Sequence, residues 1–203
     1  MNKIIIGNIL YYIGNCAPKK YKEKIYNKSI YYGNDKALYK LGSIFDNEEY
    51  LSRAFNKGNK EAAYLLGCKY EKEGDYDMAE YYYSSAILAN EDVRAMNNLA
   101  TIYFNNKNYK QMKKLYLRAI DKGNPCSMYN LGMYYESIGD IDNMKKYYKL
   151  AADNNVTHAM VRLGAYYHDI ADIDNMFHYY NNAAYNGNTD AIRLLHMYNT
   201  TEK

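Results

Sequence analysis

Three turns of the sequence carry two aspartates separated by one residue. The pairs are Asp75/Asp77, Asp140/Asp142 and Asp172/Asp174. Closely spaced carboxylates suit Ca²⁺, but a calcium loop also needs a central glycine and a bidentate glutamate further along. Neither accompanies these pairs. Because aspartate is favoured at helix N-termini, where it accepts a backbone N–H bond, we predict that the pairs cap helices and hold no metal.

Histidines and cysteines are spaced too widely for a zinc site. The histidines are His158, His168, His178 and His196, at separations of ten, ten and eighteen residues. Two zinc ligands on one helix need a separation of about four. The cysteines Cys16, Cys68 and Cys126 are three in number and more than fifty residues apart. This pattern argues against a disulfide framework and favours a reducing compartment.

Known catalytic signatures are missing from the sequence. It contains no glycine-rich phosphate loop, no Gly-x-Ser-x-Gly and no His-Glu-x-x-His. We therefore predict that the protein is not an enzyme and needs no cofactor. A Cys–His pair assembled by the fold is the alternative that the sequence leaves open. The net charge of +3 is too small to indicate a nucleic-acid or membrane partner by itself.

The elements that position these residues repeat along the chain. A small residue followed by Met or Ile recurs every 32 residues, at Ala95, Ser127, Ala159 and Ala191. Leucine follows four residues later each time. A fixed period of this length is typical of stacked repeat proteins, in which each unit buries its apolar face against the next unit.

Each repeat unit reads as two helices. In the unit that begins at Pro125, apolar or small residues recur at i, i+3, i+4 and i+7 from Met128, which indicates one buried helix face. Gly139 then ends this helix, and a second periodic face begins at Met144. Glycine directly follows the leucine of most first helices, as in Gly132. Since glycine costs up to about 1 kcal/mol there relative to alanine, we expect a close helix crossing that admits no side chain.

The repeat pattern divides the chain into one α-solenoid domain over residues 1–203. The units are 1–33, a degenerate first repeat; 34–58, a shortened repeat; 59–91, 92–123, 124–156 and 157–188, regular repeats; and 189–203, a capping helix with a tail. The first segment is also short and apolar enough after Lys3 for a signal peptide. Residues 1–16 are therefore either a repeat helix in a cytoplasmic protein, of the cell or of an infected host, or a targeting segment for secretion.

Residues 127–155 (SMYNLGMYYESIGDIDNMKKYYKLAADNN) and 159–188 (AMVRLGAYYHDIADIDNMFHYYNNAAYNGN) carry a family resemblance. Their Leu-Gly pair, following tyrosines, central Asp and Ala-Ala before Asn or Gly resemble Sel1-like repeats, which belong to the wider tetratricopeptide class. The amino-acid sequences of these units resemble those of repeats in giant DNA viruses. The resemblance implies an all-α fold, a right-handed α-solenoid of stacked antiparallel helix pairs, whose inner face is lined by the first helices. It also implies a non-catalytic scaffold or adaptor that binds protein.

Helical position predicts which residues face the inner groove. They lie two before, two after and five after the first-helix leucines. The set is Tyr39, Tyr64, Cys68, Glu71, Asn97, Thr101, Phe104, Tyr129, Met133, Glu136, Val161 and His168. This mixture of aromatic, apolar and acidic groups suits a peptide with apolar anchors and some basic residues.

The second helices of the middle units predict a different surface. Their basic outer stripe comprises Lys110, Lys113, Lys114, Arg118, Lys145, Lys146 and Lys149. A run of charge on a helix is usually a solvated face. The functional alternative is that the stripe binds nucleic acid or an acidic protein. The sequence thus favours a protein or peptide partner, keeps nucleic acid as the alternative, and indicates no membrane partner.

Overall fold

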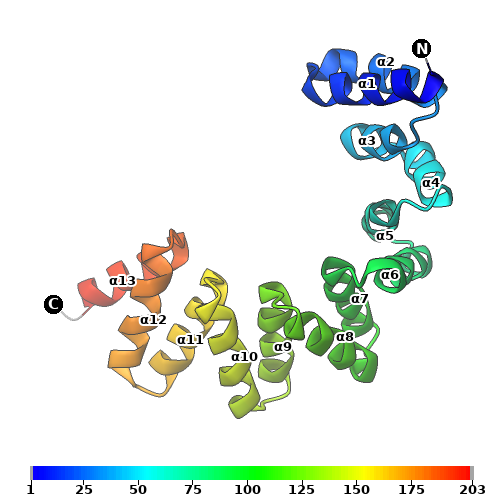
Figure 1. Ribbon diagram of the computed structural model, residues 1–203. Coiled ribbons are helices and arrows are strands. Elements are labelled where there is room, and N and C mark those ends of the chain that lie inside the picture. Colours follow the sequence, from blue (N-terminus) through cyan, green and yellow to red (C-terminus); the bar gives the residue numbers. More distant parts are fainter. Residues whose placement is uncertain (1, 202–203) are drawn as a thin grey trace. The chain divides into compact units, whose positions relative to one another are not determined.

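The computed structural model describes residues 2–201, which form α-helices joined by short turns (Figure 1). In chain order the helices are α1 (Lys3–Cys16), α2 (Lys19–Tyr31), α3 (Lys36–Phe45), α4 (Glu48–Asn56), α5 (Lys60–Glu73), α6 (Tyr76–Asn90), α7 (Val93–Asn105), α8 (Tyr109–Asp121), α9 (Pro125–Ser137), α10 (Ile141–Asp153), α11 (Thr157–Asp169), α12 (Ile173–Tyr185) and α13 (Thr189–Thr201). Within the described range no residue lies in a β-strand. The predicted all-α class is confirmed.

The chain divides into two compact units, with the division after Ile102 in α7. In the first unit, α1 packs on α2, α3 on α4 and α5 on α6, and each pair also contacts the next along the chain. In the second unit, contacts run in the same order from α8 through α13. Each helix thus buries its apolar face mainly against its neighbours in sequence, as the repeat pattern predicts.

Each unit has apolar clusters of its own. In the first unit one cluster gathers around Leu38, Leu51 and Leu66, which are at most 1% exposed. In the second unit the cluster includes Tyr148 and Leu163, also at most 1% exposed. No helix of the described chain has both the length and the apolar character needed to cross a membrane.

Helix starts use the residues that the sequence indicated. Asp75, Asp140 and Asp172 each accept a hydrogen bond from the backbone N–H three residues on, at 3.0, 3.2 and 3.2 Å. Pro125 occupies the first turn of α9, where it gives up no helical hydrogen bond. Gly139 follows that helix with φ of +73°, a conformation that side chains disfavour. The predicted capping role of the first aspartate in each pair is confirmed.

Three glycines of the first helices lie against tyrosine rings of the second helices. A Cβ atom at Gly132 would lie 2.5 Å from Cδ1 of Tyr148, and one at Gly67 would lie at the same distance from Tyr83. Gly164 and Tyr180 repeat this contact. No Cβ fits at that distance, so the predicted close crossing is confirmed.

The N-terminal helix takes part in the same kind of contact. A Cβ atom at Gly14 of α1 would lie 2.5 Å from the ring of Tyr26 in α2. The Tyr26 hydroxyl donates to Asn15 Oδ1 at 2.9 Å, and Ser29 donates to the Gly7 carbonyl at 2.8 Å. Residues 3–16 therefore pack on α2 as a first helix packs on its second helix. The repeat boundaries themselves stay a prediction.

Candidate partner-binding site

All the predicted groove residues lie on first helices. The helix α3 carries Tyr39; α5 carries Tyr64, Cys68 and Glu71; α7 carries Asn97, Thr101 and Phe104; α9 carries Tyr129, Met133 and Glu136; and α11 carries Val161 and His168. None of these residues is buried, so each side chain has some access to solvent.

A buried tyrosine of α6 brings two of these residues together in the first unit. The Tyr83 hydroxyl donates to Glu71 Oε2 at 2.5 Å, and Cys68 Sγ lies 3.4 Å from the same hydroxyl. From α7, Asn98 Nδ2 donates to the Tyr83 hydroxyl at 3.1 Å. The Glu71 carboxylate is thus held by an internal bond in addition to its access to solvent.

Burial and hydrogen bonding favour the protonated form of two tyrosines at this site. Burial, with hydrogen bonds to Cys68 and Glu71, raises the pKa of Tyr83 far above its usual value. Burial and a hydrogen bond with Cys68 raise the pKa of Tyr64 to about 12. Both hydroxyls therefore act as neutral donors rather than as general bases.

The ring of Tyr64 is covered by a cation that the sequence analysis missed. The Arg94 guanidinium lies 4.1 Å from the ring centroid. Asp92 holds it with two bonds, at 2.6 Å from Nη2 and 3.2 Å from Nε. Burial opposes ionisation of Asp92, but its bonds to Arg94 and to the Ala95 backbone outweigh burial and lower its pKa. The arrangement is a preorganised aromatic–arginine surface at the start of α7.

The second unit holds a related cluster across α9, α10 and α11. The Tyr148 hydroxyl donates to Glu136 Oε2 at 2.5 Å. Arg162 Nη1 lies 3.8 Å from Glu136 Oε1 and is also hydrogen-bonded to Tyr129. The Tyr129 ring lies 5.7 Å from that of Tyr148. The cluster thus joins the predicted residues Tyr129 and Glu136.

Several of the other predicted residues make contacts of a different kind. Phe104 packs at 6.2 and 6.4 Å from the rings of Tyr109 and Tyr134. Thr101 donates to the Asn97 backbone carbonyl within its own helix. Val161 packs against the apolar cluster of its unit, and Met133 is 39% exposed.

Two of the residues that sequence reasoning missed share one helical position. Asn98 and Arg162 each directly precede the leucine of their first helix, one place beyond the positions used for the prediction. They reach back to the Tyr–Glu pair of the preceding helices. A polar residue directly before a buried first-helix leucine is the sequence feature that would have predicted these contacts.

The basic outer stripe lies on α8 and α10, which carry all seven of its residues. Lys113 and Lys145 are half-buried, with Nζ 5.9 and 5.6 Å from the ring centroids of Tyr134 and Tyr166. Lys146 lies 5.2 Å from the Tyr147 ring. Three of the stripe's cations therefore already contact aromatic faces, while Lys110, Lys114 and Lys149 are exposed.

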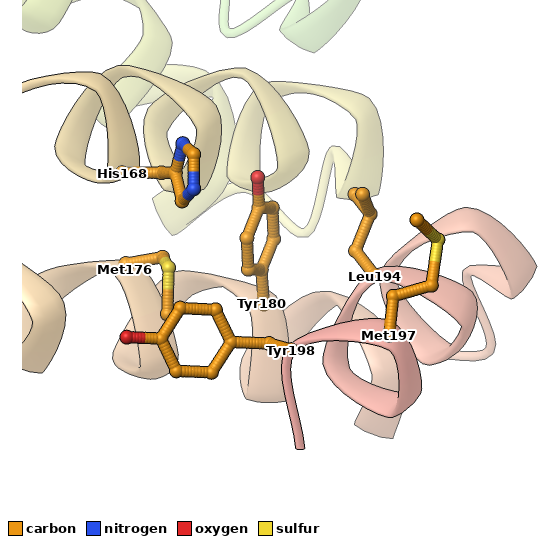
Figure 2. Close-up of a pocket in the computed structure, with 6 residues that line it drawn as sticks. All are labelled: His168, Met176, Tyr180, Leu194, Met197 and Tyr198. Carbon is orange, nitrogen blue, oxygen red and sulfur yellow. The ribbon is translucent and has the colours of Figure 1, made fainter. Parts of the chain in front are cut away.

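Three cavities lie near these residues. One of about 450 Å³ is lined by Tyr39, Lys36 and Lys40 of α3, by residues 58–61 around the start of α5, and by Tyr11 and Asn90. A second, of about 320 Å³, contains Lys149 and Tyr179. A third, of about 290 Å³, is lined by His168, Met176, Tyr180, Leu194, Met197 and Tyr198 (Figure 2).

Comparison with known proteins places the repeats in context. A family model described as tetratricopeptide repeat matches residues 93–121 and 127–155. A sequence search of curated proteins finds no match.

Two solved structures have a similar fold over most of the chain. A protective antigen of uropathogenic Escherichia coli, described as displaying an SLR fold, has a TM-score of 0.70 at 22% identity. The match covers 93% of this chain and 46% of the antigen, so this chain spans about half of the antigen's length. A Sel1 repeat protein from Oxalobacter formigenes has a TM-score of 0.67 at 18% identity, over 95% of this chain and 88% of that one. The chain therefore has the α-solenoid fold of stacked helix pairs seen in Sel1-like and tetratricopeptide-like repeat proteins.

Proposed function

We propose that this chain is a non-catalytic adaptor that binds a peptide or protein segment along its first helices. Tetratricopeptide and Sel1-like repeats generally mediate protein–protein interactions and are generally non-catalytic. The observation that carries the proposal is the fixed position of Tyr64 and Tyr129. Each stands partly exposed on a first helix and is held by an arginine of the next first helix, Arg94 or Arg162.

Aromatic side chains that are already restricted in position bind a partner effectively because little conformational entropy is lost. A tyrosine presents a large apolar area with few rotatable bonds, so binding costs little side-chain entropy. The arginine contacts reduce that cost further because they restrict the ring before a partner arrives. Glu71 and Glu136 lie on the same helices. These groups together suit a segment with apolar anchors and basic residues.

The experiment is capture of a partner from the native host cell with the tagged chain. The lysate is treated with nuclease, washed at moderate salt and read by mass spectrometry. We expect a protein recovered in near-equal amount and lost when Tyr64 and Tyr129 are changed to Ala. Tyr185→Ala is the matched control, since this tyrosine is 92% exposed on α12, a second helix.

Two outcomes would contradict the proposal. Capture that survives the Tyr64→Ala, Tyr129→Ala double variant removes these residues from the interface. Capture that disappears with nuclease or salt, and that depends on Lys113, Lys114, Lys145 and Lys146, replaces the adaptor with a nucleic-acid binder. A cytoplasmic location and the likeness to giant-virus repeats stay predictions.

A further inference from the structure

The cavity between α11, α12 and α13 differs from the other two cavities because apolar side chains form most of its lining. Four of its six lining residues are Met176, Leu194, Met197 and Tyr198, and Figure 2 shows them around the Tyr180 ring. The His168 imidazole stands across from them on α11. The volume of about 290 Å³ suits one large side chain rather than a whole small-molecule ligand.

Tyr180 is the last of a series of tyrosines that face a first-helix glycine. Its counterparts Tyr83 and Tyr148 donate to Glu71 and Glu136, each four residues after the facing glycine. At the corresponding place, four residues after Gly164, the chain has His168 instead. The structure gives the Tyr180 hydroxyl no hydrogen bond to any residue it describes, although this tyrosine is only 6% exposed. Among the described residues no side-chain polar atom is both buried and without a partner, so this hydroxyl keeps access to solvent and can donate to an incoming acceptor.

A second substitution between repeats leaves the cavity open. Arg162 extends from α11 to Glu136 and to the neighbourhood of Tyr148 in the preceding pair. The residue 32 positions later is Leu194, whose shorter side chain lines the cavity. The missing glutamate and arginine together account for an apolar space where the preceding repeat has an ion pair.

The helices that line the cavity, with the turn between α11 and α12, carry more acidic than basic residues. The helices α11 and α12 and the turn between them contribute Asp169, Asp172 and Asp174, and α13 contributes Asp190. Arg193 lies 3.4 Å from Asp190, and Arg162 is engaged with Glu136. Basic groups flanking the inserted side chain would therefore be attracted to this end of the unit.

We propose that this cavity takes one large apolar side chain of a basic peptide segment, whose backbone carbonyl accepts the hydrogen bond of the Tyr180 hydroxyl. The inference rests on the proposed function, because it assumes that the chain binds protein segments. It adds a defined anchoring site at α11–α13 and the chemistry of the residue that fills it.

The test uses the purified full chain with ¹³C-labelled methionine methyl groups, which place reporters at Met176 and Met197. The probes are acetylated peptides Lys-Arg-Phe-Lys-Arg and Lys-Arg-Leu-Lys-Arg, with Lys-Arg-Ala-Lys-Arg and Glu-Glu-Phe-Glu-Glu as comparisons. We expect the first two to shift both methyl signals in a saturable way. The alanine and acidic peptides should bind at least about tenfold more weakly, and the exposed Met133 methyl should not move.

A charge-neutral double variant tests the cavity itself. His168→Glu with Leu194→Arg rebuilds the ion pair of the preceding repeat. The new side chains should fill the cavity and accept the hydrogen bond of the Tyr180 hydroxyl. The affinity for the phenylalanine peptide should then fall at least about tenfold. The matched control is His196→Glu with Ile192→Arg, two exposed positions of α13 that do not line the cavity. It should bind as the unaltered chain does. Tyr180→Phe, which keeps the ring, should weaken binding roughly threefold to tenfold.

Several results would overturn the inference. They are an absence of methyl shifts with both basic peptides at millimolar concentration, equal binding of the acidic peptide, and unchanged binding by the rebuilt variant. If the rebuilt variant fails to fold, the peptide comparison on the unaltered chain still decides. If these tests fail while partner capture still depends on Tyr64 and Tyr129, only the cavity site is rejected. If the methyl shifts appear but capture does not depend on Tyr64 and Tyr129, the first-helix interface is rejected instead.

Discussion

At the scale of single residues, a missing side chain determines how closely two helices pack. Gly132 lets the Tyr148 ring lie directly on the α9 backbone, and Gly67 and Gly164 do the same for Tyr83 and Tyr180. The ring is then held in place, so its hydroxyl reaches Glu136 or Glu71. Close packing and the polar network above it therefore have the same origin.

Gly132→Leu should disrupt this crossing. The Cβ atom alone would lie 2.5 Å from the Tyr148 ring, so the helices must separate or the ring must move. We expect a loss of about 1–3 kcal/mol in the free energy of unfolding, measured by chemical denaturation. Met133→Leu, an exposed position of the same helix, is the control and should change stability by less than about 0.5 kcal/mol. An unchanged midpoint for Gly132→Leu would contradict the packing described here.

At the scale of the helix, local chemistry sets where each element begins and ends. Asp140 accepts bonds from the Asn143 backbone at 3.2 Å and from the Asn143 side chain at 2.8 Å. Gly139, with its positive φ, makes the turn that precedes it. These contacts involve residues three or fewer positions apart, so the sequence was sufficient to predict them.

Asp140→Ala should weaken α10 at its N-terminus. Removing the carboxylate leaves the Asn143 N–H without its acceptor, so we expect a loss of about 1 kcal/mol, measured by thermal or chemical denaturation. Asp142→Ala is the matched control, because Asp142 lies in the first turn without occupying the cap. A loss that is equal in both variants would assign the effect to helix-dipole charge rather than to capping.

At the scale of the whole molecule, buried and partly buried tyrosines link stability to alkaline pH. A hydrogen bond to Glu48 and burial raise the pKa of Tyr70 to about 12, and burial raises that of Tyr64 to about 12. The pKa values of Tyr83 and Tyr148 are also raised. Unfolded tyrosine has a pKa of about 10, so the fold favours the protonated form. The stability that these groups contribute is complete below pH 10 and is lost as pH rises toward 12.

The denaturant midpoint should therefore change little between about pH 7 and 9 and fall between about pH 10 and 12. Lysines titrate in the same range, so a variant is needed to assign the effect. Tyr70→Phe removes the hydroxyl that donates to Glu48 at 2.7 Å and should lose less stability over this interval. An identical pH dependence in the variant would remove Tyr70 from the explanation.

The sequence alone determined the repeat period, the two-helix unit, the caps and the glycine crossings. All of these follow from spacing within a helix or across one turn, where the partners are near neighbours in the chain. It also indicated that the first helices carry Tyr64 and Tyr129. The repeat boundaries and the use of these residues in binding stay predictions.

Only the tertiary structure decided what those side chains contact. Glu136 and Glu71 are bonded to tyrosines of the second helix, and Arg94 covers Tyr64 from the next first helix. The cavity over Tyr180 likewise depends on His168 and Leu194, which lie on different helices. Helical periodicity predicts the helix face on which a residue lies, but not which residue of another helix packs against it. That neighbour depends on how successive helices pack, and packing brings together residues 12 to 30 positions apart.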